Sequence, residues 1–166
     1  GAYEPPPPAE PEAEEENGKK GLSFYGAKWV SPAEAKSQRD ADRKACGWEV
    51  DFRMATRRLR IYSAVPLALT RRVAELLEHE LDLYVRRHAK VWNLASSPKP
   101  FKVYLFRDHP QFAPVAAADR QDKRCPPSVT GFFSGTSSIL YVGLSQEQAQ
   151  GNYAPEVVEE LRSDGD

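Results

Sequence analysis

The sequence predicts an α+β fold: a mixed, largely antiparallel sheet of about five strands, covered by one long helix, with shorter helices. Two observations carry this prediction. Residues 66–92 repeat apolar side chains at helical spacing, which is typical of a long helix with one buried face. Apolar or alternating runs of strand length, flanked by turn residues, occur at residues 48–52, 58–63, 101–106, 131–133 and 138–142.

The bulk composition is that of one globular domain. The chain has 166 residues, of which 40% are hydrophobic and 28% charged. No apolar run approaches the roughly 20 residues of a membrane-spanning helix, so we expect no membrane insertion. Residues 1–16 hold six Glu and no base, so residues 17–166 keep 23 basic and 18 acidic residues, a net charge of +5. This modest positive charge and the lack of a nucleic-acid-binding motif predict that the chain binds no nucleic acid. We also expect it to be a monomer.

Composition divides the chain into three segments. Residues 1–20 are dominated by Pro and Glu and hold almost no apolar side chain, which predicts a disordered arm of polyproline type. We interpret it as a linker rather than as a ligand for a proline-recognising domain. Residues 21–46 form an N-terminal strand and helix extension, and residues 47–166 form the α+β half domain.

Local signals mark the ends of the shorter helices. Ser31 and Pro32 have the residue types of an N-cap and a first helical position, and Gly47 is suited to ending that helix. Asp108 is expected to cap a second short helix that runs to about Ala118.

Side-chain periodicity assigns faces to the main elements. In residues 58–63, Leu59 and Ile61 point to one face, which predicts a half-buried strand. Residues 101–106 are nearly all apolar and are expected to form a central strand buried on both faces. The predicted buried face of the long helix comprises Leu69, Val73, Leu76, Leu77, Tyr84 and Val91.

Cys46 and Cys125 are 79 residues apart, with no CxxC spacing and no neighbouring His, so a zinc site at them is not expected. Either the two form one disulfide in an oxidising compartment or both are free. A disulfide closing a loop of this length would stabilise the fold by about 4 kcal/mol in the chain-entropy model.

The closest approach to a metal motif is at His79 and Glu80. An HExxH zinc site needs a second His one helical turn later, and Leu83 stands there. We therefore interpret His79 as an exposed histidine. Glu80 is expected on the covered face of the helix as a satisfied polar contact, with Tyr84 and Arg87 within reach.

The remaining polar candidates also have structural interpretations. His88 flanks the apolar face of the long helix and is expected to pack. Asp108 and His109 could form a dyad, but helix capping accounts for the aspartate. No nucleophile elbow surrounds the turn serines Ser134, Ser137 and Ser138. We predict no catalytic and no metal-binding residue in this chain.

From about residue 29 to residue 160 the chain resembles the peptidase-MA-like, gluzincin-type domains of bacterial proteins of unknown function, of the DUF1570 type. The matching stretches are KWVSPAEA, WEVDFRMATRRLRIYS with the long helix after it, KVYLFRDHPQF, and GFF followed by SILYVG. In such domains an HExxH helix follows the last of these strands, and that helix supplies the zinc ligands and the catalytic Glu. No position of this sequence matches them, so the resemblance implies no cofactor in this chain and zinc only in a longer parent.

The resemblance also implies a binding edge, because the strand before the zinc helix lines the cleft and can pair with an extended peptide. That strand comprises Ser138, Ile139, Leu140, Tyr141 and Val142.

Three hypotheses follow. The chain is the non-catalytic front half of a zinc-metallopeptidase-like domain, providing the scaffold and the substrate-side edge strand. Alternatively, it is a protein-interaction module outside the cytoplasm, periplasmic or secreted, that binds an extended partner by strand addition; a cytoplasmic location is the other option. A third hypothesis is an enzyme that uses Asp108, His109 or Glu80.

Overall fold

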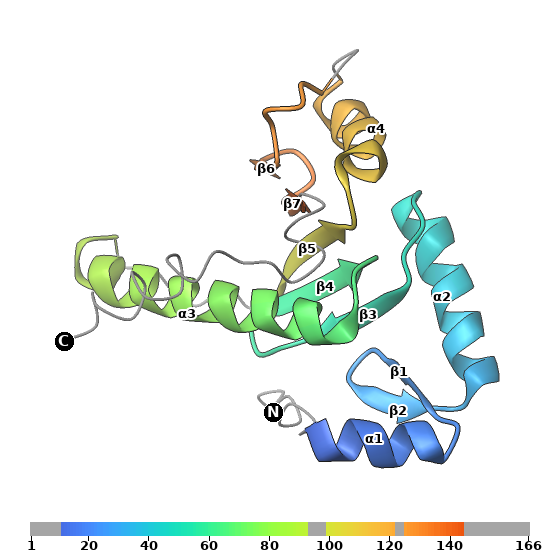
Figure 1. Ribbon diagram of the computed structural model, residues 1–166. Helices are drawn as coiled ribbons and strands as arrows, with labels where there is room; N and C mark the ends of the chain where they lie inside the picture. The colour runs from blue at the N-terminus through green and yellow to red at the C-terminus, as the bar shows by residue number, and fades with distance from the viewer. Residues whose placement is uncertain (1–10, 93–98, 122–124, 145–166) are drawn as a thin grey trace.

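The computed structural model describes residues 11–92, 99–121 and 125–144, which form an α+β fold as predicted (Figure 1). The described elements, in chain order, are α1 (Pro11–Lys19), β1 (Ser23–Tyr25), β2 (Lys28–Val30), α2 (Pro32–Cys46), β3 (Phe52–Ala55), β4 (Leu59–Ser63), α3 (Leu67–Trp92), β5 (Phe101–Phe106), α4 (His109–Arg120), β6 (Gly131–Ser134) and β7 (Ile139–Gly143).

The main sheet has five strands in the order β3-β4-β5-β7-β6, and β1 and β2 form a separate hairpin. The pairs β3–β4 and β6–β7 are antiparallel, whereas β4–β5 and β5–β7 are parallel. The sheet is therefore mixed, as predicted, with antiparallel and parallel pairs in equal number. The parallel pairs follow from the two crossings: α3 returns the chain to the end of the sheet where β4 began, and after α4 the antiparallel strand β6 returns it to the end where β5 began.

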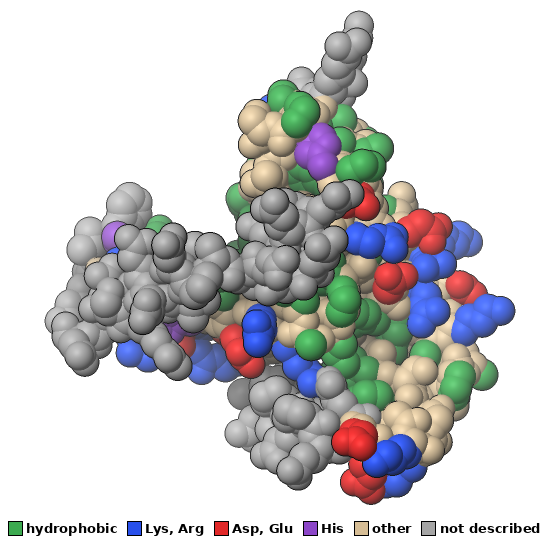
Figure 2. Space-filling view, in the orientation of Figure 1, with side chains coloured by type: hydrophobic (Ala, Val, Ile, Leu, Met, Phe, Trp, Pro, Cys, Tyr) green, Lys and Arg blue, Asp and Glu red, His purple; other side chains and the backbone are tan. Residues whose placement is uncertain are grey.

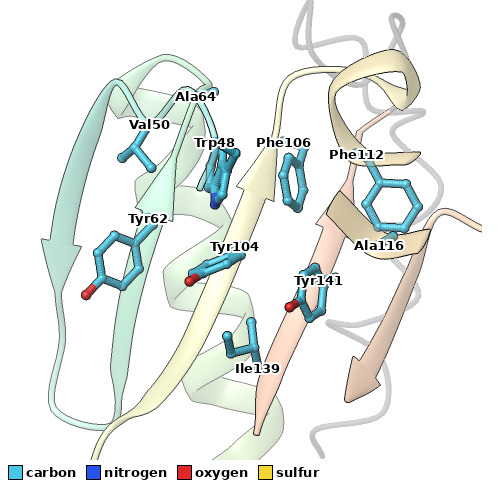
Figure 3. Packing of buried hydrophobic residues seen from close by; sticks show 10 residues of the cluster. All are labelled: Trp48, Val50, Tyr62, Ala64, Tyr104, Phe106, Phe112, Ala116, Ile139 and Tyr141. Atoms are coloured by element: carbon cyan, nitrogen blue, oxygen red, sulfur yellow. The ribbon is translucent and has the colours of Figure 1, made fainter. Parts of the chain in front are cut away.

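Two hydrophobic clusters cover the two faces of the main sheet. On one face α3 packs through Leu69 and Ala74 against Ile61 and Leu105. The other face lies under α4 and the segment after α2, and is largely aromatic (Figure 3). β5 is the central strand and is buried on both faces from residue 103 to 106, which confirms its prediction. The large buried rings on the aromatic face are Trp48, Tyr62, Tyr104, Phe106, Phe112 and Tyr141.

The long helix begins within one residue of its predicted start and ends at the predicted Trp92. Its buried face differs from the predicted one, since Leu76 and Tyr84 are 44% and 54% exposed. The helix extends well past the sheet, so that only its first part lies against the strands (Figure 1). Val91 was also assigned to this face, but its side chain lies outside the described residues.

The predicted helix ends are confirmed. Ser31 accepts a hydrogen bond at its Oγ from the Glu34 N–H at 3.2 Å, and Gly47 ends α2 with φ at 75°. Asp108 Oδ1 accepts from the Gln111 N–H at 2.9 Å and so caps α4.

Two boundaries differ from the predictions. Residues 11–19 of the expected arm form α1, in which Glu15 pairs with Lys19 one helical turn later; residues 1–10 lie outside the described part. The strand predicted at residues 48–52 begins only at Phe52. The preceding residues form a packed loop, because Trp48 and Val50 are buried in the aromatic cluster.

Candidate functional site

β7 is an interior strand, so the binding edge expected at residues 138–142 is wrong. β7 pairs with β5 on one side and β6 on the other. Ile139 and Tyr141 are buried, while Leu140 and Val142 are half-buried. Ser138 precedes the strand, in the hairpin turn, with φ at 57°. A strand paired on both sides has no row of free backbone groups to offer a partner.

The edges of the main sheet are β3 and β6. The outer side of β3 is partly occupied, since the Gly26 N–H donates to Arg53 O at 2.7 Å and Gly26 forms a bridge with Met54. In the part of the chain that the structure describes, no strand pairs with the outer side of β6. Among the described strands, β6 is therefore the open edge.

The hydrogen bonds of the hairpin show which backbone groups of β6 face outward. The Gly143 N–H donates to Thr130 O at 2.6 Å. In an antiparallel ladder the bonded residues alternate, so Thr130, Phe132 and Ser134 direct their backbone groups toward β7. Gly131 and Phe133 consequently direct their N–H and C=O groups away from the sheet, where an added strand would lie.

The side chains of β6 differ between its two faces. On the α4 face, Phe132 stacks on Tyr141 with ring centroids 4.8 Å apart. On the α3 face, Phe133 is 56% exposed. Beside it Gly131 has no room for a side chain, because a Cβ there would lie 2.9 Å from Tyr141 O. The edge therefore presents one exposed ring beside one bare backbone position.

A shallow pocket of about 520 Å³ lies beside β6, between the end of α4 and the hairpin turn. α4 ends at Gln121, which is left-handed with φ at 56°. The turn is closed by the Ser138 N–H donating to Ser134 O at 2.8 Å and by the Ser137 N–H donating to Ser134 Oγ at 3.2 Å. The pocket is lined by Asp119, Arg120, Gln121, Phe132, Phe133, Ser134 and Thr136.

Asp119 is the acidic residue among the described residues that line this pocket. Burial alone would raise its pKa, but interactions with the hydroxyls of Ser134, Ser137 and Tyr141 together outweigh burial and leave the pKa below its ordinary value. Ser137 Oγ itself is buried and makes no hydrogen bond of ordinary geometry within the described residues. The carboxylate is therefore ionised at neutral pH and accepts hydrogen bonds only.

A row of rings supports this edge from within the sheet. Tyr62, Tyr104 and Tyr141 occupy matching positions on β4, β5 and β7, with centroids 5.6 and 5.4 Å apart (Figure 3). Phe132, opposite Tyr141 on β6, continues the row. Each contact of this kind adds about 0.5–1.5 kcal/mol beyond the burial of its area. The row ties the open strand to the centre of the sheet.

Cys46 and Cys125 both pack against the aromatic cluster, and in the structure both are free thiols, the second of the two alternatives. Burial raises the pKa of Cys46, although its hydrogen bond with Tyr104 acts in the opposite direction. The Cys46 thiol is thus a protonated packing group at neutral pH.

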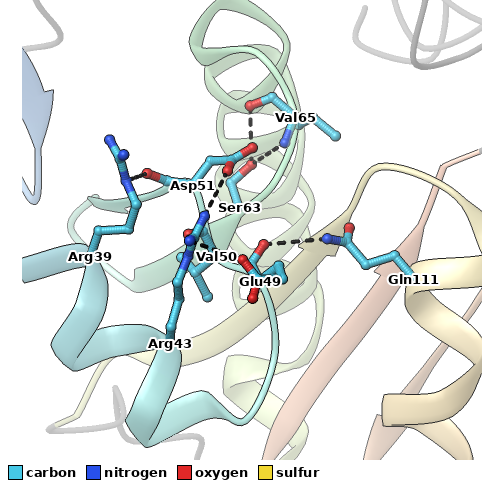
Figure 4. A network of polar contacts seen from close by, with 8 residues as sticks. All are labelled: Arg39, Arg43, Glu49, Val50, Asp51, Ser63, Val65 and Gln111. Carbon is cyan, nitrogen blue, oxygen red and sulfur yellow. Dashed lines mark hydrogen bonds and ion pairs between the residues drawn. The ribbon is translucent and has the colours of Figure 1, made fainter. Parts of the chain in front are cut away.

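A second polar network holds the loop between α2 and β3 (Figure 4). Arg39 Nε donates to Asp51 O at 2.8 Å, and Arg43 Nε donates to Val50 O at 2.7 Å. Arg43 also pairs with Glu49 at 2.9 Å. These contacts join elements of the fold, so we assign the network a structural role. Over α2 and this loop, Figure 2 shows basic and acidic side chains intermingled.

The carboxylates of α3 lie differently from the prediction. Glu80, expected on the covered face, is exposed, as is His79. Glu78 is the partly buried acid, and its Oε1 accepts from the Arg58 N–H at 2.8 Å. The register of the helix on the sheet, which the sequence does not specify, places Glu78 toward the strands.

The other candidates are accounted for by packing or capping. His88 packs on Tyr84, with ring centroids 4.5 Å apart. His109 Nε2 lies 3.2 Å from Pro126 O, and the adjacent Asp108 caps α4.

In residues 11–92, 99–121 and 125–144, no group of three or more His, Cys, Asp or Glu is placed to hold a metal ion. No helix in these ranges is long and apolar enough to cross a membrane.

Sequence reasoning missed both Asp119 and the edge position of β6. A signal for the edge was present, since GFFS places an exposed Gly131 and Phe133 on one face, whereas ILYVG is apolar on both.

Comparison of the chain with protein-family models, curated proteins and solved structures finds no match, so the peptidase-like resemblance rests on the quoted motifs alone.

Proposed function

We propose that this domain binds an extended segment of a partner protein by strand addition to the outer edge of β6. The observation that carries the proposal is the outward direction of the backbone groups of Gly131 and Phe133 at the open edge of the main sheet. An extended peptide would satisfy these groups with main-chain hydrogen bonds and would continue the sheet.

The character of the edge supports this proposal. Proteins usually protect open edges with Lys, Pro, a bulge or a covering segment, because an unprotected edge promotes association. The four residues of β6 include no charged residue and no Pro. The exposed ring of Phe133 adds apolar surface at the same place. These features suit an edge that pairs with a partner.

The second candidate function is the non-catalytic front half of a zinc-metallopeptidase-like domain, with β6 in place of β7 as its substrate-side strand. The antiparallel orientation of β6 at the end of a mixed sheet favours it. Zinc and the catalytic Glu would then come from residues of a longer parent. Zinc titration by calorimetry is the test, and we expect no tight, stoichiometric binding to this chain. Tight binding at one equivalent would contradict this assignment.

Strand addition has a specific signature in amide hydrogen exchange. Peptides that bind the full chain are first selected from a random display library. In the free protein the Gly131 and Phe133 amides should exchange fast, and in the complex they should be protected. The Phe132 amide, bonded to β7, should be protected in both states. A selected peptide that leaves the Gly131 and Phe133 amides unprotected would show that β6 is not the site.

A matched pair of variants separates backbone pairing from side-chain contact. Phe133→Pro removes the outward N–H, and proline is tolerated at such a position on an edge strand. Phe133→Thr removes the ring but keeps the N–H. Binding should be lost in Phe133→Pro and only weakened in Phe133→Thr. Equal affinities of the two variants would count against strand addition.

A further inference from the structure

We propose that the pocket beside β6 receives a lysine or arginine side chain, so that the domain prefers an extended segment with a basic residue opposite Phe132. This inference rests on the proposed function and names the class of segment that β6 takes up. It is carried by the position of the pocket on the α4 face of β6 and by the chemistry of Asp119.

The register of an added strand leads one side chain to the pocket. Gly131 and Phe133 would each form a hydrogen-bonded pair with one residue of the bound segment. The segment residue between those two therefore lies opposite Phe132. Residues directly opposite each other place their side chains on the same face of a sheet. For Phe132 this is the face toward Tyr141 and α4, where Phe132 and Ser134 line the pocket. The segment's residue opposite Phe132 therefore lies next to the pocket.

The pocket is suited to a cation. The Asp119 carboxylate is ionised and accepts hydrogen bonds only. The C-terminal end of α4, which closes at Gln121, carries partial negative charge from its last carbonyl groups. The Thr136 hydroxyl adds an acceptor for an ammonium or a guanidinium group. An acidic side chain would meet repulsion from Asp119.

Arg120 is the basic residue among the described residues that line the pocket. Its Cζ lies 5.6 Å from the centroid of Phe132, over the ring. This placement directs its charge to the ring face, a favourable cation–π contact. Asp119 is the acidic residue among the described residues of the lining.

The opposite face of the edge favours apolar neighbours for the basic residue. The residues of the segment paired with Gly131 and Phe133 would point to the α3 face. Phe133 offers an exposed ring there, and Gly131 presents no side chain of its own. The preferred pattern is therefore apolar, basic, apolar.

Synthetic peptides test this preference without altering the protein. The probe carries a fluorophore and the core Thr-Ile-Lys-Ile-Thr, and its two controls replace Lys by norleucine or by Glu. We expect the Lys peptide to bind about threefold to fivefold more tightly than the norleucine peptide, as for a partly exposed ion pair. The Glu peptide should bind more weakly than both. The difference should shrink as salt is added. Fluorescence anisotropy on the full chain measures all three affinities.

Two variants locate the source of the preference. Asp119→Asn keeps the shape of the side chain and removes its charge, so it should abolish the preference for Lys over norleucine. Asp40→Asn makes the same change of charge at an exposed position of α2, and it should leave the preference intact. Circular dichroism checks that both variants are folded.

The outcomes distinguish the two proposals. Equal binding of all three peptides with protected Gly131 and Phe133 amides would overturn the basic-residue preference and keep strand addition. A preference for Lys that persists in Asp119→Asn would also overturn it. Absence of binding by every peptide, with no amide protected, would overturn strand addition and the inference that rests on it.

Discussion

Asp42 is the residue that joins the N-terminal hairpin to the main sheet. Its Oδ2 accepts from the Tyr25 hydroxyl at 2.7 Å and its Oδ1 pairs with Arg53 NH1 at 2.9 Å. The ring of Tyr25 is fully buried, and Asp42 is 7% exposed. Capping residues such as Ser31 could be predicted because the signal is local. Asp42 could not, because its partners come from other segments and meet it only in the folded chain.

At this scale we predict that Asp42→Ala lowers the free energy of unfolding by about 2–3 kcal/mol, because it leaves the Tyr25 hydroxyl and Arg53 without their acceptor. Asp42→Asn should cost less, since its amide oxygen still accepts one hydrogen bond. Urea denaturation of the two variants and the natural chain measures the difference. A loss below about 0.5 kcal/mol for Asp42→Ala, the range of ordinary surface substitutions, would contradict this role.

Among the elements, β6 and β7 show what a sequence leaves open. The turn around Gly135 predicts that the two strands form a hairpin, and they do. It does not specify which of them pairs with β5, because that contact joins segments distant in the chain. The same limit applies to α3. Its length was predicted, but the part of the helix that extends past the sheet leaves side chains exposed that were predicted to be buried.

The two strands should therefore respond differently to proline. Leu140→Pro places proline inside a strand that is paired on both sides, and should destabilise the fold by about 3 kcal/mol or more. Phe133→Pro, on the outer edge, should cost much less. Thermal unfolding followed by circular dichroism compares them, and a greater loss of stability for Phe133→Pro would mean that β6 is not the edge.

For the whole molecule, buried tyrosines set the response to alkali. Burial is the main cause that raises the pKa of Tyr25, Tyr104 and Tyr141 above its ordinary value near 10. Because their folded pKa values are raised, the stability they contribute is complete below pH 10 and is lost as pH rises through the folded values. The burial of β5 on both faces was predicted from its apolar run, whereas the burial of Tyr62 was not, because residues 58–63 were expected to form a half-buried strand.

We thus expect the melting temperature to fall steeply above pH 10, the ordinary tyrosine value. Tyr25→Phe removes one of the titrating groups, and so its melting temperature should fall less over the same range. Calorimetric scans from neutral to alkaline pH test this prediction. A profile for Tyr25→Phe as steep as that of the natural chain would show that Tyr25 does not contribute.

The insertion of β7 between β5 and β6 also has a consequence for synthesis. Residues 131–143 supply both the outer edge and the strand that completes the centre of the sheet. Until this hairpin has left the ribosome, one side of β5 stays unpaired, with Val103 and Leu105 in the same strand. A nascent chain at that stage exposes an apolar edge of the kind that promotes aggregation. Emergence of this hairpin replaces that hazardous edge with the short edge of β6.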